Sequence, residues 1–414
     1  MITSNHIRFR CLVVGFALCA GFMAVRNPRA QSSSERLVLV GGRVFPFPES
    51  EPVDNATVVI ENGRILGVGA RERVRIPAGA RTIDCDGLTI LAGFQNSHVH
   101  FTEDKWNDAG KQPAGKLTGQ LSAMFLRYGF TTVVDTTSLL SNTVELRKRI
   151  MMGELDGPRI ITAGLALYPP NGVPYYVKEV VPPELFSLLL QPVTAGESRA
   201  MVRTQKTSGA DIVKLFTGSN VTRSQVVAMP LAVARAAVAE AHSRNELVFA
   251  HPGNVAGLDV AIEAGVDVVA HAVEGTVGLT DSHFQEMKRR HMSLIPTLKL
   301  LGDGDDRQAI RNEVRDFARL GGEIIFGTDV GFLSDYDPLR EYELMTASGL
   351  NWRQVLESLT TSPANRFGEA KRRGRIAAGF DADVVVLGSD PTQSVHAFTD
   401  VRYTIRSGRV VYAR

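Results

Sequence analysis

The chain has 414 residues, with 46 Lys and Arg against 44 Asp and Glu and a formal net charge of +2. This length is enough for a barrel of about 250 residues plus a second, smaller domain. Because charges of both signs are interspersed, the composition gives no indication of a nucleic-acid or anionic membrane partner. The basic runs 147–149 and 371–373 each stand beside an acidic residue, which is typical of solvated surface.

The first thirty residues differ from the rest of the chain. A basic start precedes the apolar run CLVVGFALCAGFMAV, whose length suits a signal peptide better than a membrane span. We therefore predict that residues 1–30 are a signal peptide cleaved after Ala30, and that the protein is exported, periplasmic or secreted. An uncleaved membrane anchor is the alternative. Beyond this segment the only cysteine is Cys85, so no internal disulfide can form.

Short alternating strands then occur at both ends of the chain. Their segments are RLVLVGGRVF, ATVVIENGRILGVG, RTIDCDGLTILAG, ADVVVLGSDP and VRYTIRSGRVVYA. Asn62-Gly63 marks a two-residue turn inside the second segment. Two β-rich ends around a different middle predict one small domain, a β-sandwich built from residues 35–90 and 370–414.

The middle of the chain alternates apolar strands with amphipathic helices. The candidate strands are GFQNSHVHF, TTVVDTT, RIITAGLAL, DIVKLF, LVFAHPG, VDVVAHAV, SLIPTL and IIFGTDV. Helix-period segments such as PLAVARAAVAEAHSRN and RQAIRNEVRDFARLGG lie between them. Eight β-then-α units predict an α/β fold, a (β/α)8 TIM barrel over residues 91–369. An open doubly wound sheet is the alternative, but no G-x-G-x-x-G loop supports it.

Polar side chains stand at the C-terminal ends of the predicted strands, the end at which such barrels carry their chemistry. They are His98 and His100 on the first strand, Lys214 on the fourth, His251 on the fifth, His271 on the sixth and Asp329 on the eighth. Each alone has a structural explanation, such as a salt bridge or a helix cap. Together they indicate a metal site at one barrel mouth. Four further histidines are interpreted as structural or surface residues: His242, His283, His291 and His396.

From about residue 36 to its end, the chain resembles the amidohydrolase superfamily, and within it the imidazolonepropionase-like and prolidase-like branch. The resemblance is carried by GFQNSHVHF, ADIVKLF, FAHPGN, DVVAHAVEG, IIFGTDVG and GRIAAGFDADVVVLGSDP. Two departures precede the first ligands: Ala92 where the family usually has proline, and Asn96 where it usually has aspartate. Neither removes a ligand, but they leave open how the first strand is supported.

The resemblance implies a centre with two divalent ions, zinc or similar. The implied ligands are His98, His100 and Asp329 for one ion and His251 and His271 for the other. By the same resemblance, Lys214 reacts with carbon dioxide to give a carbamate that bridges both ions. Two metals can share a hydroxide and polarise a substrate carbonyl together. Asp329 is the candidate catalytic residue for proton transfer.

We therefore predict a metal-dependent amidohydrolase that cleaves an amide or peptide-like carbon–nitrogen bond of a small molecule such as a dipeptide. One alternative is a one-metal deaminase or cyclic-amidine hydrolase. Deaminases of the superfamily usually carry a glutamate shortly after the fifth-strand histidine, whereas Pro252-Gly253 follows His251 here. The alternative of another class is a non-catalytic scaffold, which would typically have lost ligands. We expect no nucleic-acid partner and no stable membrane association after signal removal.

The loop 167–194 is long, proline-rich and aromatic. On a barrel it would overhang the mouth, where Tyr168, Tyr175 and Tyr176 could shape a substrate pocket as part of a lid. The alternative is a packed surface excursion.

Overall fold

The computed structural model describes residues 36–181 and 183–414, so the predicted signal peptide lies outside the described residues. The strands are β1 (Arg36–Val44), β2 (Val53–Glu61), β3 (Arg64–Ala70), β4 (Arg81–Asp84), β5 (Thr89–Ala92), β6 (Phe94–Val99), β7 (Phe130–Asp135), β8 (Arg159–Thr162), β9 (Val213–Phe216), β10 (Gly218–Asn220), β11 (Val226–Ala228), β12 (Val248–His251), β13 (Val268–Ala270), β14 (Ser293–Ile295), β15 (Glu323–Ile324), β16 (Val384–Leu387), β17 (Val401–Arg406) and β18 (Arg409–Ala413). The α-helices are α1 (Ala114–Met124), α2 (Leu140–Met151), α3 (Tyr175–Val180), α4 (Ala195–Thr207), α5 (Leu231–His242), α6 (Val255–Ala264), α7 (Asp281–Arg289), α8 (Leu298–Leu301), α9 (Gln308–Arg319), α10 (Leu339–Ala347), α11 (Trp352–Leu359) and α12 (Thr361–Arg366). Within the described ranges, none of these helices has the length and apolarity that crossing a bilayer requires.

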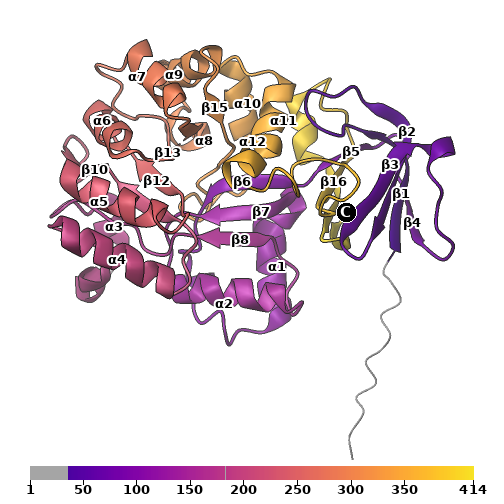
Figure 1. The fold of residues 1–414 in the computed structure, drawn as a ribbon, viewed down its shortest axis with the longest axis horizontal. Helices are drawn as coiled ribbons and strands as arrows, with labels where there is room; N and C mark the ends of the chain where they lie inside the picture. Colours follow the sequence, from indigo (N-terminus) through magenta and orange to yellow (C-terminus); the bar gives the residue numbers. More distant parts are fainter. Residues whose placement is uncertain (1–35, 182) are drawn as a thin grey trace, which may run out of the picture. The chain divides into compact units, whose positions relative to one another are not determined.

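Strands from both ends of the chain pair in one sheet. Its order is β18-β17-β16-β5-β1-β2-β3, with β4 paired to β1, and Figure 1 shows the indigo N-terminal strands beside the yellow β16. Asn62 and Gly63 join β2 to β3 with φ of 51° and 76°, the positive values that a two-residue type I′ turn requires. The pairing of the described strands gives a single eight-stranded sheet. It does not show the two packed layers of the predicted sandwich.

Alternation along β16 joins this sheet to the rest of the protein. Val384 and Val386 pack in the sheet's own core, whereas Val385 and Leu387 point to the opposite face and enter the main core. Directly after β5, the Gly93 N–H donates to the Asp383 carbonyl at 2.8 Å. The sheet therefore anchors the start of β6, the strand that carries His98.

Each of the eight segments predicted as strands in the middle of the chain overlaps a parallel strand, although the last shares only Ile324 with β15. They pair as a three-stranded sheet, β6-β7-β8, and a five-stranded sheet, β15-β14-β13-β12-β9. Backbone hydrogen bonds cross between these sheets on both sides. Leu167 N donates to Lys214 O at 2.9 Å on one side. Asp329 N donates to His98 O, also at 2.9 Å, on the other.

The last of these strands is much shorter than its sequence predicts. IIFGTDV extends to Val330, but β15 ends at Ile324. Beyond that point the chain follows β6 irregularly, with Ser97 N donating to Phe326 O at 2.7 Å. Asp329 has a φ of 60°, which no regular strand residue adopts. The apolar pattern marks burial, and only the tertiary contacts show that the backbone leaves the strand conformation.

One buried apolar cluster takes residues from several of the parallel strands and their ends. Its members are Val134, Ile161, Ala163, Ile212, Phe249, Val268, Ala270, Ile295 and Ile325. In β12, Phe249 joins this cluster, whereas Val248 and Ala250 belong to the main core. Because side chains alternate along a strand, the shared cluster indicates that one face of each strand points to a common interior.

Helix α9 shows how a helix supports the site from outside the sheets. Ile310, Val314 and Phe317 form its buried stripe, and Gly321 ends the segment with a φ of 76°. Glu313 lies among these buried residues although it is acidic. The helix therefore carries a carboxylate inward.

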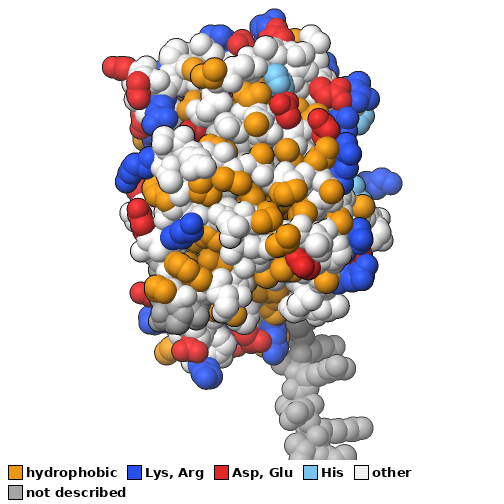
Figure 2. Space-filling model, turned by 90° about the vertical axis from the view of Figure 1, so that its left-hand side faces the viewer, with side chains coloured by type: hydrophobic (Ala, Val, Ile, Leu, Met, Phe, Trp, Pro, Cys, Tyr) orange, Lys and Arg blue, Asp and Glu red, His pale blue; other side chains and the backbone are white. Residues whose placement is uncertain are grey.

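Figure 2 shows the face on the side of α3 to α6, where hydrophobic side chains gather in the middle and charges of both signs lie mostly around the edge.

Candidate metal centre

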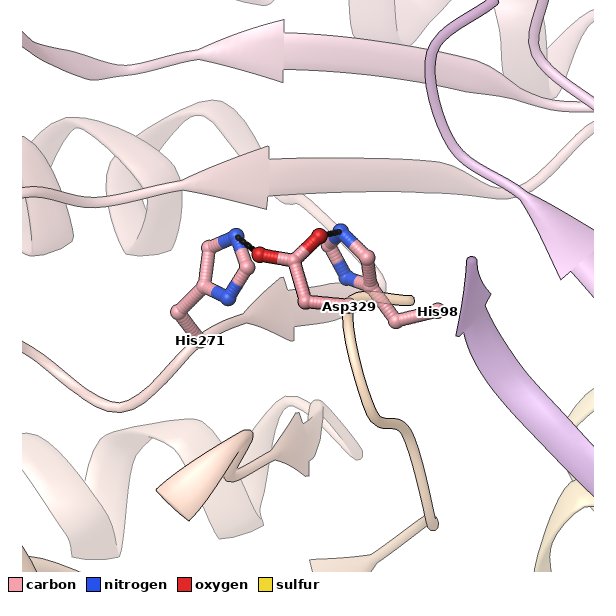
Figure 3. A group of neighbouring side chains, drawn as sticks. All are labelled: His98, His271 and Asp329. Atoms are coloured by element: carbon pink, nitrogen blue, oxygen red, sulfur yellow. Dashed lines mark ion pairs between the residues drawn. The ribbon is translucent and has the colours of Figure 1, made fainter. Parts of the chain in front are cut away.

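Imidazoles and one carboxylate meet where the parallel strands end. The ligand atoms of His98, His271 and Asp329 all lie within 4.8 Å of one another, and all three residues are buried. Figure 3 shows Asp329 between the two histidines, with its oxygens directed toward their rings. The nitrogen nearest to this carboxylate belongs to His100, whose Nε2 lies 2.7 Å from Asp329 Oδ1. His98 Nε2 is 3.5 Å from the same oxygen, and His271 Nε2 is 4.0 Å from Oδ2.

The two other predicted ligands lie beside this group. His251 ends β12, and its ring lies 4.9 Å from that of His271 and stacks on Phe216 at 4.6 Å. Lys214, in β9, is fully buried. Burial and the Lys214 charge lower the pKa of His251 to about 3. The same two causes hold the pKa of His98 and His271 well below the ordinary value. All six residues predicted from the sequence are therefore brought together.

A hydrogen bond fixes which nitrogen of His100 faces Asp329. His100 Nδ1 lies 2.8 Å from the Thr137 carbonyl oxygen, which can only accept, so Nδ1 carries the proton. In the neutral ring Nε2 is then an acceptor that faces a carboxylate oxygen, also an acceptor. In the metal-free site burial lowers the pKa of His100, but the contact with Asp329 outweighs burial and the net shift is upward.

His271 shows the same arrangement. Its Nδ1 lies 2.8 Å from the Thr297 hydroxyl oxygen. That hydroxyl donates its only hydrogen to the Pro296 carbonyl at 2.9 Å, so it accepts from His271. Nε2 of His271 is therefore left as an acceptor on the side of Asp329. Metal-binding histidines are usually oriented in this way, by a partner that takes the proton of the other ring nitrogen.

Several buried polar atoms of the cluster have no hydrogen-bond partner among the described residues. They are both ring nitrogens of His98, both ring nitrogens of His251, Lys214 Nζ and Asp329 Oδ1. Buried polar atoms are normally paired, so this concentration at one place points to a group that the chain itself does not supply. Neutral imidazoles and a carboxylate suit zinc and similar divalent ions. The residues present therefore fit a divalent metal.

Lys214 differs from an ordinary lysine. Burial lowers its pKa to about 7, although the Asp329 charge opposes this shift. A large share of the amine is then uncharged near neutral pH, and an uncharged amine is nucleophilic. The side chain can therefore react as an amine as well as bear a charge.

The backbone is strained at three positions of the centre. His271, Thr297 and Asp329 have φ of 98°, 45° and 60°. Side chains with a Cβ seldom occupy these conformations, and such residues concentrate at functional sites. Gly331 serves the same turn, because a Cβ there would lie 2.0 Å from the His100 carbonyl oxygen.

Two buried carboxylates hold these strained segments in place. Glu313 of α9 accepts the Val273 N–H through both oxygens, at 3.0 and 2.9 Å. Glu341 of α10 accepts the N–H groups of Leu298 and Lys299 at 2.9 and 2.6 Å. Burial raises the pKa of Glu313 to about 8 and that of Glu341 to about 7. Helices α9 and α10 thus fix the loops that present His271 and Thr297.

Asn96 supports the first strand in place of the aspartate that related sequences usually carry. It is fully buried, and its Nδ2 donates to Thr328 Oγ1 at 2.7 Å. Its Oδ1 accepts from the backbone N–H of His98 at 3.2 Å and of Thr328 at 3.3 Å. An ionised aspartate has no hydrogen to donate, so in its place the Thr328 hydroxyl would have to be the donor. The amide therefore ties β6 to the segment that leads to Asp329.

Sequence reasoning missed Asp135, Thr137 and Thr297. Asp135 ends β7 and accepts from the hydroxyls of Thr143 and Thr162 at 3.0 and 2.7 Å. Asp135 lies at the C-terminal end of a strand, which is the feature that identified the histidines. The same feature could have identified Asp135. Thr137 acts through a backbone carbonyl and Thr297 through a strained turn, so no residue pattern marks either.

The other four histidines lie apart from the cluster. Nε2 of three of them faces an acidic side chain: His242 with Asp267 at 2.9 Å, His283 with Asp259 at 3.4 Å and His396 with Glu343 at 3.1 Å. His291 is exposed in the turn after α7, and its carbonyl accepts from Arg366. These positions agree with the structural interpretation made from the sequence.

The loop 167–194 packs beside the centre. Tyr168 is buried, and its ring lies 4.7 Å from that of Phe216, which in turn stacks on His251. The ring of Tyr176 lies 5.5 Å from that of Phe332, three residues beyond the catalytic candidate. Burial holds the pKa of Tyr176 well above its usual value, so its hydroxyl keeps its proton. The loop thus brings aromatic surface and a hydroxyl donor close to the ligands.

Comparison with known proteins agrees with this site. The Amidohydrolase family matches residues 89–411. The ochratoxinase of Aspergillus niger is 24% identical over 423 residues, 91% of this chain and 86% of that protein. The imidazolonepropionase of Thermoplasma acidophilum is 23% identical over 432 residues, 93% of this chain and 97% of that protein. With the 5-methylthioadenosine/S-adenosylhomocysteine deaminase of Symbiobacterium thermophilum, identity is 40% over 67 residues, so the chain spans only 15% of that relative's length.

The fold matches solved structures over nearly the whole described chain. A Xaa-Pro dipeptidase crystallised with bound methionine superimposes with a TM-score of 0.77 at 22% identity, covering 92% of this chain and all of that one. The chain thus combines an α/β fold with a buried cluster of imidazoles and one carboxylate. Because the family match covers most of the sequence, the chain belongs to the amidohydrolase family, and the resemblance seen in the sequence is confirmed.

Proposed function

We propose that the protein is a metal-dependent amidohydrolase that cleaves the amide or peptide-like carbon–nitrogen bond of a small molecule. One observation carries the proposal. The Nε2 atoms of His100 and His271, whose protons are on Nδ1, face the oxygens of Asp329, so three acceptors point at one another inside the protein. A divalent cation satisfies all of them at once. When bound, such an ion polarises a carbonyl oxygen and lowers the pKa of a water molecule.

We propose that the centre holds up to two ions, zinc or similar. His98, His100 and Asp329 would hold one, and His251 and His271 the other. Lys214 would lie between them as a carbamate. Its amine nitrogen would form a bond to the carbon of carbon dioxide and release one proton, so that a neutral amine becomes an anionic oxygen ligand. The pKa of Lys214 near 7 and the unpaired Nζ support this assignment.

Asp329 is the proposed proton carrier. Its Oδ1 lies 2.7 Å from His100 Nε2, which is an acceptor in the neutral ring, so this oxygen can accept a proton from the attacking water. The leaving nitrogen needs a proton when the bond breaks, and the same carboxyl group can deliver it. Tyr176 keeps its hydroxyl proton and can donate to the substrate from the loop, while Phe332 offers apolar contact.

The names of the full-length relatives support a substrate with a carbon–nitrogen bond, because they include an ochratoxinase and an imidazolonepropionase. We propose dipeptides, N-acyl amino acids and cyclic amides as the substrate class. We also propose that the loop 167–194 acts as a lid, in which Tyr168, Tyr175 and Tyr176 shape the pocket.

A one-metal deaminase is the second candidate, favoured by the local identity of 40% with a deaminase. The charge of Lys214 lowers the pKa of His98, His251 and His271, so the lysine acts on both proposed ligand groups. This argues for a two-metal centre, because a one-metal centre has no use for a bridging anion. The complete ligand set argues against a non-catalytic scaffold. The two enzyme candidates differ in product, since a deaminase releases ammonia and an amidohydrolase acting on a dipeptide releases amino acids.

The finer features of the fold and location are proposals as well. We propose that the eight parallel strands close into a barrel over residues 91–369, supported by the backbone hydrogen bonds on both sides of the two sheets. The terminal domain of residues 35–90 and 370–414 and its sandwich form remain predictions. So do the signal peptide, residues 1–30, and export, which N-terminal sequencing of protein from its native host would test.

The function is tested by metal analysis and a substrate screen. Protein purified without chelator should hold about one to two equivalents of zinc or a similar ion, and should hydrolyse at least one member of a panel of dipeptides, N-acyl amino acids and cyclic amides. Chelation should abolish turnover, and zinc should restore it. Full activity in metal-free protein would refute the proposal.

The carbamate is tested separately with Lys214→Ala. The variant should lose metal and activity, and a short carboxylic acid should partly restore both by supplying the missing anionic ligand. Removal of dissolved carbon dioxide during metal loading should lower the metal content of the wild type only. A Lys214→Ala protein with two ions and wild-type turnover would show that the lysine is structural.

A further inference from the structure

One cavity of the described structure lies at the opposite ends of the parallel strands from the candidate metal centre. Its volume is about 780 Å³. Pro158, Asp211 and Leu247 line it, each just before or at the start of a strand whose far end points to the metal centre. Helices α2 and α12 and the end of β17 complete the wall. Cavities that hold small molecules typically measure about 300 to 1,000 Å³, so this one has a suitable size.

The wall of this cavity combines apolar and cationic side chains. The apolar ones are Ile150, Met151, Ile160, Ile161, Ile212, Leu247 and Phe367. The cationic ones are Arg147, Arg159, Arg366 and Arg406. One acidic side chain, that of Asp211, also lines it. The cavity is therefore a predominantly apolar space with an excess of positive charge.

Three of the four arginines are neutralised by carboxylates of the chain. Arg147 pairs with Asp211. Arg159 pairs with Glu369 at 2.6 Å. Arg366 pairs with Glu323, also at 2.6 Å. The charges of these three arginines are thus already compensated within the chain.

Arg406 is different. Within residues 36–181 and 183–414, its side chain has no hydrogen-bond or ion-pair partner, although it is partly buried. Burial lowers its pKa, and the charges of Arg373 and Arg159 lower it further, against the attraction of Asp383. A guanidinium among other guanidinium groups, at the edge of an apolar cavity, is stabilised by an anion from outside the chain.

We propose that this cavity is a second ligand site, which takes a small molecule with an apolar body and one carboxylate or phosphate group. The apolar body lies against the isoleucines and Phe367, and the anionic group accepts hydrogen bonds from Arg406. The site is separate from the metal centre, since its residues lie at the other ends of the strands.

The test is calorimetric titration of the full chain with octanoate and with octyl phosphate, with octanol as the uncharged control. Carboxylates also bind divalent ions, so each titration is made on metal-free and metal-loaded protein. Binding at the cavity has the same Kd in both, and octanol binds more weakly than the two anions. The anion with the lower Kd shows whether the cavity prefers a carboxylate or a phosphate group. Binding that appears only in metal-loaded protein would overturn the proposal.

Two variants locate the binding. Arg406→Gln should weaken the Kd of the better anion by about 10- to 100-fold, the usual effect of losing a charge-assisted hydrogen bond. Met151→Glu places a negative charge on a wall residue whose side chain is 76% exposed, and it should weaken binding by repulsion without disturbing the fold.

The matched control is Arg414→Gln, which removes an exposed arginine just after β18 that pairs with Asp400 outside the cavity wall. Its Kd should stay within about two-fold of the wild type. Equal Kd values for Arg406→Gln, Met151→Glu and the wild type would show that the anions bind elsewhere, and no binding to any protein would show that the cavity holds only water.

Discussion

Two regions of the protein bury polar and charged groups, and they differ in how these groups are paired. One is the candidate metal centre, and the other is a group of charges beside the terminal sheet. We call the second group the arginine–carboxylate cluster: Glu369, Arg372, Arg373, Asp381 and Asp383. In it Arg373 lies 3.0 Å from Glu369, 3.0 Å from Asp381 and 3.4 Å from Asp383. Each carboxylate faces a cation of the chain.

At the metal centre the nearest groups to Asp329 are imidazole nitrogens whose protons lie on the other side of the ring. In a cluster that is neutralised within the chain, removing one partner leaves an uncompensated buried charge and destabilises the fold. A cluster that the chain leaves without neutralising partners requires an ion or ligand from outside. Such a cluster is therefore a candidate binding site. The same substitution made in both regions should therefore have different consequences.

The largest effect is expected from Asp329→Asn. The amide cannot carry the proton, so kcat should fall by about 10²- to 10⁴-fold with a smaller change in KM. Because Asn can donate to an imidazole nitrogen, the metal-free variant should be at least as stable as the wild type. Steady-state kinetics, metal content and melting temperature are measured on one preparation. An undiminished kcat in the metal-loaded variant would remove Asp329 from the mechanism.

Thr297→Val tests the support of a ligand. It removes the acceptor of the His271 Nδ1–H and keeps the branched shape of the side chain. Loss of such a partner typically costs about 10- to 100-fold in metal affinity or activity, and competition with a zinc chelator measures it. The control is Thr404→Val, which removes a buried hydroxyl bond to Leu126 O at 2.6 Å in β17. Equal zinc affinities in the two variants would contradict the assigned role.

Asp381→Asn makes the same aspartate-to-asparagine change as Asp329→Asn, but in the arginine–carboxylate cluster. Asp381 lies 3.1 Å from Arg64 and 3.0 Å from Arg373. Removing its charge should lower the free energy of unfolding by about 1–3 kcal/mol, which urea denaturation measures, while kcat and metal content stay at wild-type values. A loss of turnover in folded Asp381→Asn protein would mean that the two regions are not separate.

The last prediction concerns pH and Glu313. Burial raises the pKa of this carboxyl from 4.5 to about 8, so between these values the folded protein holds a proton that the unfolded chain releases. Its contribution to stability is therefore full below pH 4.5 and is lost as the pH rises toward 8. Glu313→Gln cannot titrate. The melting temperature of the wild type should fall relative to that of the variant across this range, and parallel curves would show that Glu313 stays ionised.

Much of the site could be predicted because it depends on local rules. Strand alternation and the position of polar residues at strand ends identify His98, His100, Lys214, His251, His271 and Asp329 without a structure. Asn62-Gly63 predicts its turn because few residues tolerate positive φ at two successive positions. The apolar spacing of α9 predicts the helix within a residue at its start and a few at its end.

What the sequence could not decide depends on contacts between distant segments. The tautomers of His100 and His271 are set by the Thr137 carbonyl and the Thr297 hydroxyl, and a strand-end rule does not place either. The short β15 and the pairing of all described terminal strands in one sheet also follow from packing, because periodicity reports which face is buried and not what covers it. Sequence alone thus determined which residues could bind a metal, while the tertiary structure decided which of their atoms are left without a partner.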